Sequence, residues 1–186
     1  MKNKTIRFVK CSLFIFFLFF IILIILAPVY QRSYTIKDLS GSVGVIDNPN
    51  ITKYMVFPWN YIYSFGDIWC HQKEERSFFI NGNQMPIWAR CTGLFLGIAI
   101  GAGVSIFLKI KIDENIHKKI LVQLTIGYFP IMLDLTGQAI GLWHSINVVR
   151  ILTGTLAGLT FAMIFGILIE IIGKAMQKST IFYSKI

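Results

Sequence analysis

The segment TGLFLGIAIGAGVSIFLK, residues 92–109, carries no charge before its last position and has a small residue at every fourth place from Gly93. An α-helix rises 1.5 Å per residue, so about 20 apolar residues cross the hydrocarbon core of a bilayer. Side chains spaced four apart share one helix face, and small side chains there let a second helix approach closely. The segment therefore predicts a membrane helix whose packing face consists of Gly93, Gly97, Gly101 and Ser105.

Three further apolar segments lie before and after this one, and 55% of the 186 residues are hydrophobic. The segments are SLFIFFLFFIILIILA (12–27), ILVQLTIGYFPIMLDLTGQAIGL (120–142) and ILTGTLAGLTFAMIFGILIEIIG (151–173). Two glycine pairs repeat the fourfold spacing and predict further contact faces: Gly137 with Gly141, and Gly154 with Gly158. We therefore expect an all-α membrane protein with four transmembrane helices and an extended outer loop between the first and second.

These segments divide the chain into four parts. We expect an amino-terminal membrane anchor (residues 1–29), an outer loop that contains the motif from Cys70 to Cys91 (30–91), a three-helix membrane core (92–173) and a cytosolic tail (174–186). The anchor is expected to be retained, because no small-residue cleavage site follows the first apolar segment.

The net charge of +9 comes from lysines and arginines that cluster around the ends of the apolar segments. Because they form no continuous basic face, nucleic acid is not expected as a partner, whereas the lipid bilayer is. Loops on the cytosolic side of a membrane carry an excess of lysine and arginine. The distribution therefore predicts a multi-pass protein of the cell membrane with both termini in the cytosol.

The outer loop is long enough to hold a small structure outside the membrane. The turn signal DNPN (47–50) suggests a hairpin in its first half. The stretch FPWNYIYSFGDIW (57–69) is aromatic but too short to span the bilayer, so we expect an interfacial helix or a surface packed onto the helix bundle.

Asp134 lies within a predicted membrane helix and is a candidate functional residue, because a carboxylate cannot comfortably face lipid. If its helix continued far enough, Gln138 and Ser145 would share its face, while Asn147 and Arg150 would lie on the following helix. This arrangement predicts either a structural ion pair between Asp134 and Arg150, or an Asp134 that binds a cation, takes up a proton or takes part in catalysis.

Cys70, His71 and Cys91 are candidate metal ligands just outside the membrane core, with Asp134 or His144 to complete a site for zinc or another divalent metal. His71 and Asp134 are also candidate catalytic residues of such a site. A disulfide between Cys70 and Cys91 explains the two cysteines equally well.

Three arginines near the same boundary are candidates for binding the phosphate of a lipid headgroup or of another small charged ligand. Arginines at membrane interfaces also reach lipid phosphates without specificity. Glu170 is expected either to form a local ion pair with Lys174 or to be exposed at the membrane interface. The candidate ligand-binding set is Gln72, Arg76, Arg90, Gln138, Ser145, Asn147 and Arg150.

Several separated motifs resemble the predicted membrane proteins catalogued as domain of unknown function 2085. They are Cys70-His71-Gln72, Arg76-Ser77-Phe78, Gln84-x-Pro86 and Ala89-Arg90-Cys91-Thr92-Gly93, followed by Asp134, Gln138, Gly141, Ser145, Asn147, Arg150, Thr153 and Gly154. The resemblance covers roughly residues 65–173 and implies no particular reaction, substrate or cofactor. This chain has Trp88 where the family typically has the first cysteine of Cys-Ala-Arg-Cys, which leaves Cys70 as the nearest partner for Cys91.

The sequence contains no phosphate-binding glycine-rich loop, no H-E-x-x-H pair and no serine nucleophile elbow, which argues against nucleotide hydrolysis, gluzincin-type proteolysis and lipase-type acyl transfer. Three hypotheses remain for an outward-facing polar site. In the first, the site binds a charged ligand such as a metal ion, and the protein is a membrane-embedded enzyme. In the second, the site binds or transports an anionic lipid headgroup or solute. In the third, the protein has a structural role in assembly.

Overall fold

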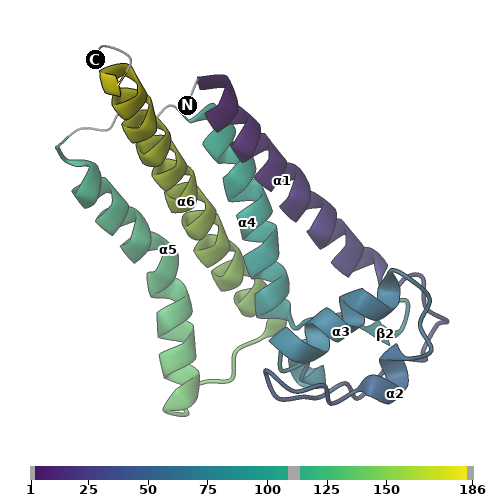
Figure 1. Ribbon diagram of the computed structural model, residues 1–186. Helices are drawn as coiled ribbons and strands as arrows, with labels where there is room; N and C mark the ends of the chain where they lie inside the picture. The colour runs from purple at the N-terminus through teal and green to yellow at the C-terminus, as the bar shows by residue number, and fades with distance from the viewer. Residues whose placement is uncertain (1–2, 109–113, 184–186) are drawn as a thin grey trace.

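The computed structural model describes residues 3–108 and 114–183, and four long helices dominate it (Figure 1). The helices are α1 (Asn3–Leu26), α4 (Ala89–Phe107), α5 (Ile116–Ala139) and α6 (Asn147–Tyr183). Each contains a stretch that is long and apolar enough to cross a membrane. The predicted helical class and the four transmembrane helices are confirmed. Helix α1 begins earlier than its predicted span, and α6 continues beyond residue 173.

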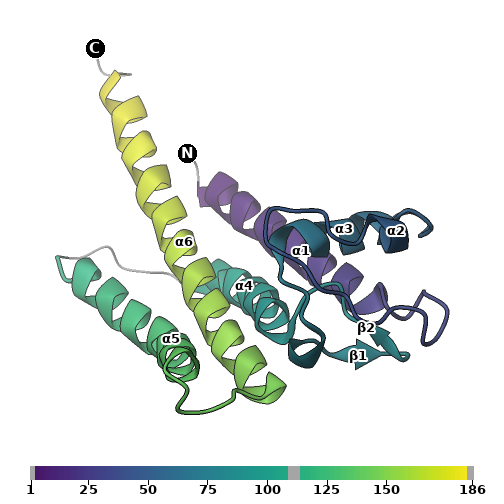
Figure 2. The ribbon, with the colours of Figure 1, turned by 90° about the horizontal axis from the view of Figure 1, so that it is seen from below.

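The four helices lie in the spatial order α1, α4, α6, α5, so that α4 packs between α1 and α6 (Figures 1 and 2). Helices α4 and α6 run parallel, and both begin at the end of the bundle where residues 30–88 lie. We call this end the loop end. The beginning of α1 and the end of α6 lie at the opposite end, which we call the terminal end.

The contact between α4 and α6 depends on glycine because the two backbones touch. A β-carbon built on Gly97 would lie 2.1 Å from the carbonyl oxygen of Thr155, and one on Gly158 would lie 2.0 Å from that of Leu94. No side chain fits at such distances, so only glycine permits this approach. The predicted packing faces of these two helices are confirmed.

Helix α5 ends earlier than expected, and the pair Gly137 with Gly141 is not a helix face. The amide of Leu142 donates to the carbonyl of Gly137 at 2.9 Å, and the amide of Gly141 donates to that of Gln138 at 3.2 Å. With Gly141 at φ +75°, this pattern is a Schellman motif, which stops a helix. The expected helical stripe from Asp134 to Ser145 is therefore wrong.

Buried amide side chains organise the loop at the end of the bundle. Asn83 is fully buried, and its Oδ1 accepts hydrogen bonds from the amides of Thr35 at 2.9 Å and Ile36 at 3.0 Å. Gln84 is also fully buried, and its Nε2 donates to the carbonyl of Gln72 at 2.6 Å. These side chains satisfy buried backbone groups that have no partner in a sheet.

The strands β1 (Phe79–Ile80) and β2 (Asn83–Gln84) form a short hairpin in the second half of the loop. Residues 30–48 contain no strand or helix, so the expected hairpin in the first half is wrong. The DNPN signal instead begins the short helix α2 (Pro49–Thr52), because proline suits the first turn of a helix.

Helix α3 (Trp59–Trp69) packs across the loop end of the bundle, as predicted for the aromatic stretch. The ring of Phe65 lies 5.0 Å from that of Phe20 in α1 and 5.9 Å from that of Phe95 in α4, measured between centroids. These edge-to-face contacts bury aromatic surface between the loop and two long helices. A 3-10 turn, η1 (Glu74–Arg76), then leads towards the hairpin.

A buried ion pair joins three helices near the terminal end of the bundle. Lys10 Nζ lies 2.6 Å from Glu170 Oε1 and also donates to the carbonyl of Ser105 at 2.9 Å. The side chains of Lys10 and Glu170 are 4% and 12% exposed. The expected pair of Glu170 with Lys174 is therefore wrong, since Glu170 faces α1 and α4 while Lys174 is exposed.

Candidate functional site

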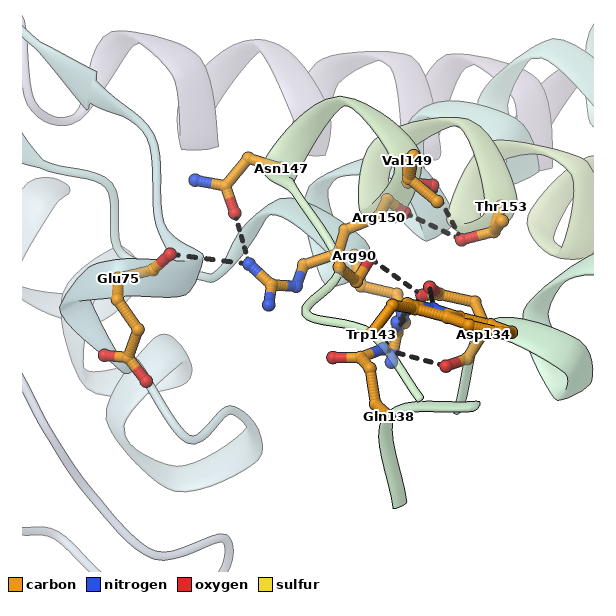
Figure 3. Close-up of polar contacts among 10 residues, drawn as sticks. Glu75, Arg90, Asp134, Gln138, Trp143, Asn147, Val149, Arg150 and Thr153 are labelled. Carbon is orange, nitrogen blue, oxygen red and sulfur yellow. Dashed lines mark hydrogen bonds and ion pairs between the residues drawn. The ribbon is translucent and has the colours of Figure 1, made fainter. Parts of the chain in front are cut away.

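A buried ion pair between Arg90 and Asp134 forms the centre of the polar site at the loop end (Figure 3). Arg90 lies in the first turn of α4, and its Nη2 donates to Asp134 Oδ2 near the end of α5. The residues are 7% and 4% exposed. The expected pairing of Asp134 with Arg150 is thus wrong, because Arg90 occupies the carboxylate.

Asp134 accepts three further hydrogen bonds. Gln138 Nε2 and Ser145 Oγ each donate to Oδ2 at 3.0 Å, and Trp143 Nε1 donates to Oδ1 at 3.3 Å. Ser145 and Trp143 reach the carboxylate because the chain turns back after Gly141. A carboxylate has about four acceptor positions, so Asp134 is the acceptor at the centre of a network and not an open metal ligand.

Arg150 lies beside this network in the first turn of α6 and is only 7% exposed. Its Nη1 donates to Asn147 Oδ1 at 2.8 Å and to the carbonyl of Glu75 at 3.4 Å (Figure 3). Within residues 3–108 and 114–183, no carboxylate forms an ion pair with it. The charges of Arg76 and Arg90 repel it more strongly than the charges of Asp134 and Glu75 attract it. Arg150 is therefore a buried cation held by neutral acceptors.

Two of the arginines lie over the indole ring of Trp88. The guanidinium carbons of Arg76 and Arg90 are 5.5 and 5.9 Å from the centroid of its indole ring. Such stacking holds guanidinium groups without using their N–H donors. The Nε of Arg90 is buried and has no hydrogen-bond partner among the described residues. We call Arg76, Arg90 and Arg150 the arginine cluster.

Two helix N-termini add to the positive potential around the arginine cluster. Helices α4 and α6 both begin at the loop end, at Ala89 and Asn147. The first amide groups of a helix lack intrahelical acceptors and carry partial positive charge. The N-cap residue Trp88 provides no side-chain acceptor for those of α4. This arrangement suits a bound anion.

The predicted metal site is not formed. The Sγ atoms of Cys70 and Cys91 are 3.7 Å apart, and both cysteines are free thiols. His71 is exposed, with its Nδ1 3.3 Å from the carbonyl oxygen of Gly41, while Asp134 belongs to the arginine network. In the part of the chain that the structure describes, no three His, Cys, Asp or Glu residues are grouped to hold a metal ion.

The remaining candidate residues fall into two places. Gln138 and Ser145 bind Asp134, and Asn147 connects Arg150 with the loop by donating to the carbonyl of Ser77 at 3.1 Å. Gln72 instead lies buried within the loop, where its Nε2 donates to the carbonyl of Pro86 at 2.7 Å. His144 is exposed beside the network.

Two tryptophans that were not among the predicted site residues also belong to the site. Trp88 stacks with arginines and Trp143 donates to Asp134, whereas an interfacial position alone would require neither contact. A useful signal was the position of Trp88 two residues before Arg90, since residues this close at a helix start lie at the same end of the bundle.

The fold and the site define an α-helical multi-pass membrane protein with a buried, arginine-rich network at one end of its bundle. The chain belongs to the family described as "Predicted membrane protein (DUF2085)", whose model matches residues 70–164. The resemblance noted from the motifs is therefore confirmed. The matched region contains Cys70, the arginine cluster and Asp134, but neither Lys10 nor Glu170.

Two relatives are similar to much of this chain. An uncharacterised protein of Methanocaldococcus jannaschii is 37% identical over 124 residues, which cover 64% of this chain and 78% of the relative. An uncharacterised protein of Methanothermobacter thermautotrophicus is 34% identical over 103 residues, which cover 55% of this chain and 89% of the relative. No solved structure matches the chain.

Proposed function

We propose that this protein binds a phosphate-bearing anion at the arginine cluster, as a binding or transport component of the membrane. The observation that carries this proposal is the environment of Arg150, a guanidinium that is 7% exposed and has no carboxylate partner among the described residues. A buried charge without a counter-charge costs several kcal/mol, and a bound anion would remove this cost.

The surrounding charges support an anion over a metal cation. Of the two carboxylates near the arginine cluster, Asp134 is occupied by Arg90 and its other donors. The Glu75 side chain is 67% exposed and lies 3.6 Å from Arg76 Nε, where water screens it strongly. Guanidinium groups donate in pairs to phosphate oxygens, which gives the proposed site its selectivity for phosphate groups.

A phosphate group at this depth has two sources, a lipid headgroup or a soluble phosphate compound. In the lipid case, the apolar surfaces of α5 and α6 would contact the acyl chains. In the soluble case, the ligand would enter from the aqueous side of the loop end. Both sources use the same arginines.

Replacing Arg150 with glutamine is expected to weaken phosphate binding at least about tenfold, because a charge-assisted hydrogen bond contributes roughly 1.5–3 kcal/mol. The protein in lipid nanodiscs would be titrated with inorganic phosphate by calorimetry, and retained phosphatidylglycerol would be counted by native mass spectrometry. The matched control is Arg32→Gln, since the Arg32 side chain is exposed in the loop.

Binding of inorganic phosphate that Arg150→Gln weakens and Arg32→Gln leaves unchanged would support a soluble ligand. The same pattern for phosphatidylglycerol alone would support a lipid headgroup. If wild-type protein binds neither probe, or if the two variants lose binding equally, the proposal is wrong.

We further propose that the loop end faces away from the cytosol across the cell membrane, with both termini inside. The cytosolic excess of basic residues in membrane proteins supports this orientation, because Lys4, Arg7, Lys118 and Lys119 lie at the terminal end. A cysteine at Lys53 should then react with a membrane-impermeant maleimide in intact cells, and one at Lys174 only after permeabilisation. Wild-type protein measures the background from native cysteines, and the reverse labelling pattern would invert the proposed orientation.

A further inference from the structure

An apolar pocket of about 360 Å³ lies between α3 and α4 at the loop end. Its lining consists of both cysteines of the loop end together with five apolar residues, Phe65, Trp69, Ile87, Leu94 and Phe95. The volume falls in the range of roughly 300–1,000 Å³ that is usual for small-molecule sites. None of these residues belongs to the arginine cluster, so the pocket is distinct from the proposed anion site, although Trp88 contacts both.

The two cysteines are placed for reaction with each other. Their Sγ atoms are 3.7 Å apart, and a disulfide requires about 2.05 Å. Cys70 follows the last turn of α3 and Cys91 lies in the first turn of α4, so a small movement of one helix end suffices to bring the sulfurs together. Cys11 lies on α1, near Lys10 at the terminal end, and does not line the pocket.

Trp88 donates hydrogen bonds to both sulfurs. Its backbone amide is 3.3 Å from Cys70 Sγ, and its indole Nε1 is 2.6 Å from Cys91 Sγ. The hydrogen bond from Cys91 and then the amide of Trp88 lower the pKa of the Cys70 thiol, although burial opposes this effect. A lowered pKa increases the fraction of thiolate, which is the form of cysteine that attacks an electrophile.

We propose that Cys70 and Cys91 are a redox-active pair whose electron acceptor is an apolar two-electron carrier of the quinone class, bound in this pocket. The Cys70 thiolate adds to the quinone ring and forms a carbon–sulfur bond. The sulfur of Cys91 then attacks that of Cys70, so that the disulfide forms as the carbon–sulfur bond breaks. The ring leaves as the quinol with the two electrons of that bond and the two protons of the thiols.

The chemistry of the pocket favours a quinone over a water-soluble oxidant. Its walls are aromatic and aliphatic, and one of them is the beginning of α4, a helix that is apolar enough to cross a membrane. A charged oxidant such as glutathione disulfide would have to lose its hydration to enter, at a cost of several kcal/mol. The N-terminus of α4 also favours the negative charge that develops on the ring during reduction.

The test uses the reduced full-length protein in lipid nanodiscs under anaerobic conditions, with a short-chain ubiquinone as the probe. Quinol is measured by absorbance, and remaining thiols are counted by maleimide mass tagging. We expect one quinol per chain and the loss of two thiols in wild type and in Cys11→Ser. Cys70→Ser and Cys91→Ser should each yield no quinol.

Two substitutions on α3 separate quinone entry from a structural role of the cysteines. Trp69 and Tyr61 are exposed aromatic residues on this helix, but only Trp69 lines the pocket. Trp69→Glu is expected to slow quinone reduction roughly tenfold, because a carboxylate at the rim opposes entry of an apolar ring, whereas Tyr61→Glu leaves the rate unchanged. Thiols that stay reduced with the quinone, equal slowing by both variants, or equally fast oxidation of wild type by glutathione disulfide would each overturn the proposal.

Discussion

Replacing Gly97 with leucine is expected to destroy the native packing of α4 against α6. Even the first side-chain carbon at this position would lie 2.1 Å from the carbonyl oxygen of Thr155 and 2.7 Å from the amide nitrogen of Leu159. Both are backbone atoms of α6, so the clash can be relieved only by moving the whole helix. Because association of membrane helices depends on close packing, we expect a loss of about 3 kcal/mol or more in the free energy of unfolding.

Reversible unfolding in mixed detergent micelles, followed by tryptophan fluorescence, measures this loss. The matched control is Gly103→Leu in the same helix, where a β-carbon would first meet the ring of Phe14 at 3.0 Å. A side chain can rotate away, so this variant should lose far less stability than Gly97→Leu. Equal losses for the two glycines would mean that the α4–α6 contact does not govern stability.

Replacing Asp134 with leucine is expected to lower the free energy of unfolding by about 3–5 kcal/mol, as removal of one partner of a buried ion pair usually does. The substitution leaves the Arg90 guanidinium buried without its carboxylate. It also removes the carboxylate acceptor shared by Gln138 and Ser145. Gln138 Nε2 keeps its hydrogen bond to the backbone carbonyl of residue 134 at 3.1 Å, whereas Ser145 Oγ loses its acceptor in the network.

A second substitution can identify the arginine that needs Asp134. Replacing a buried ion pair with apolar residues is often nearly neutral, so adding Arg90→Met should recover most of the stability that Asp134→Leu loses. Adding Arg150→Met should change stability by the same amount in Asp134→Leu as in wild type, because Arg150 makes its hydrogen bonds to Asn147 and Glu75 and not to Asp134. The same unfolding measurement applies to all variants. Recovery by Arg150→Met alone would restore the pairing expected from the sequence and contradict the structure.

The identities of the charged residues at the loop end could be predicted, but their pairing could not. A carboxylate in an apolar helix and arginines at a membrane boundary are recognisable from local composition. Which arginine reaches Asp134 depends on where α5 ends and how α4 packs beside α6. The Schellman motif at Gly141 stops the helix, and the chain then turns Ser145 and Trp143 back to the carboxylate.

The metal prediction shows the same limit. Cys70 and Cys91 do come close together, as either a metal site or a disulfide required. The other two predicted ligands, His71 and Asp134, do not join the cysteines, because each contacts other groups in the folded protein. His71 is exposed beside a backbone carbonyl, and Asp134 is surrounded by donors. Residue type and spacing indicate what a side chain can bind, while its tertiary contacts decide whether it remains available.

By itself, the amino-acid sequence determined the four membrane helices and the packing faces of α4 and α6. Both follow from local properties, namely the length of an apolar segment and the spacing of small residues along a helix. Only the tertiary structure decided the ion pairs, since Arg90 and Asp134 are 44 positions apart and Lys10 and Glu170 are 160 apart. Long-range pairs depend on how the helices are placed, and many charged residues along a chain satisfy the same local pattern. Burial then selects one partner, because a charge removed from water is stable only beside the group that the packed helices bring to it.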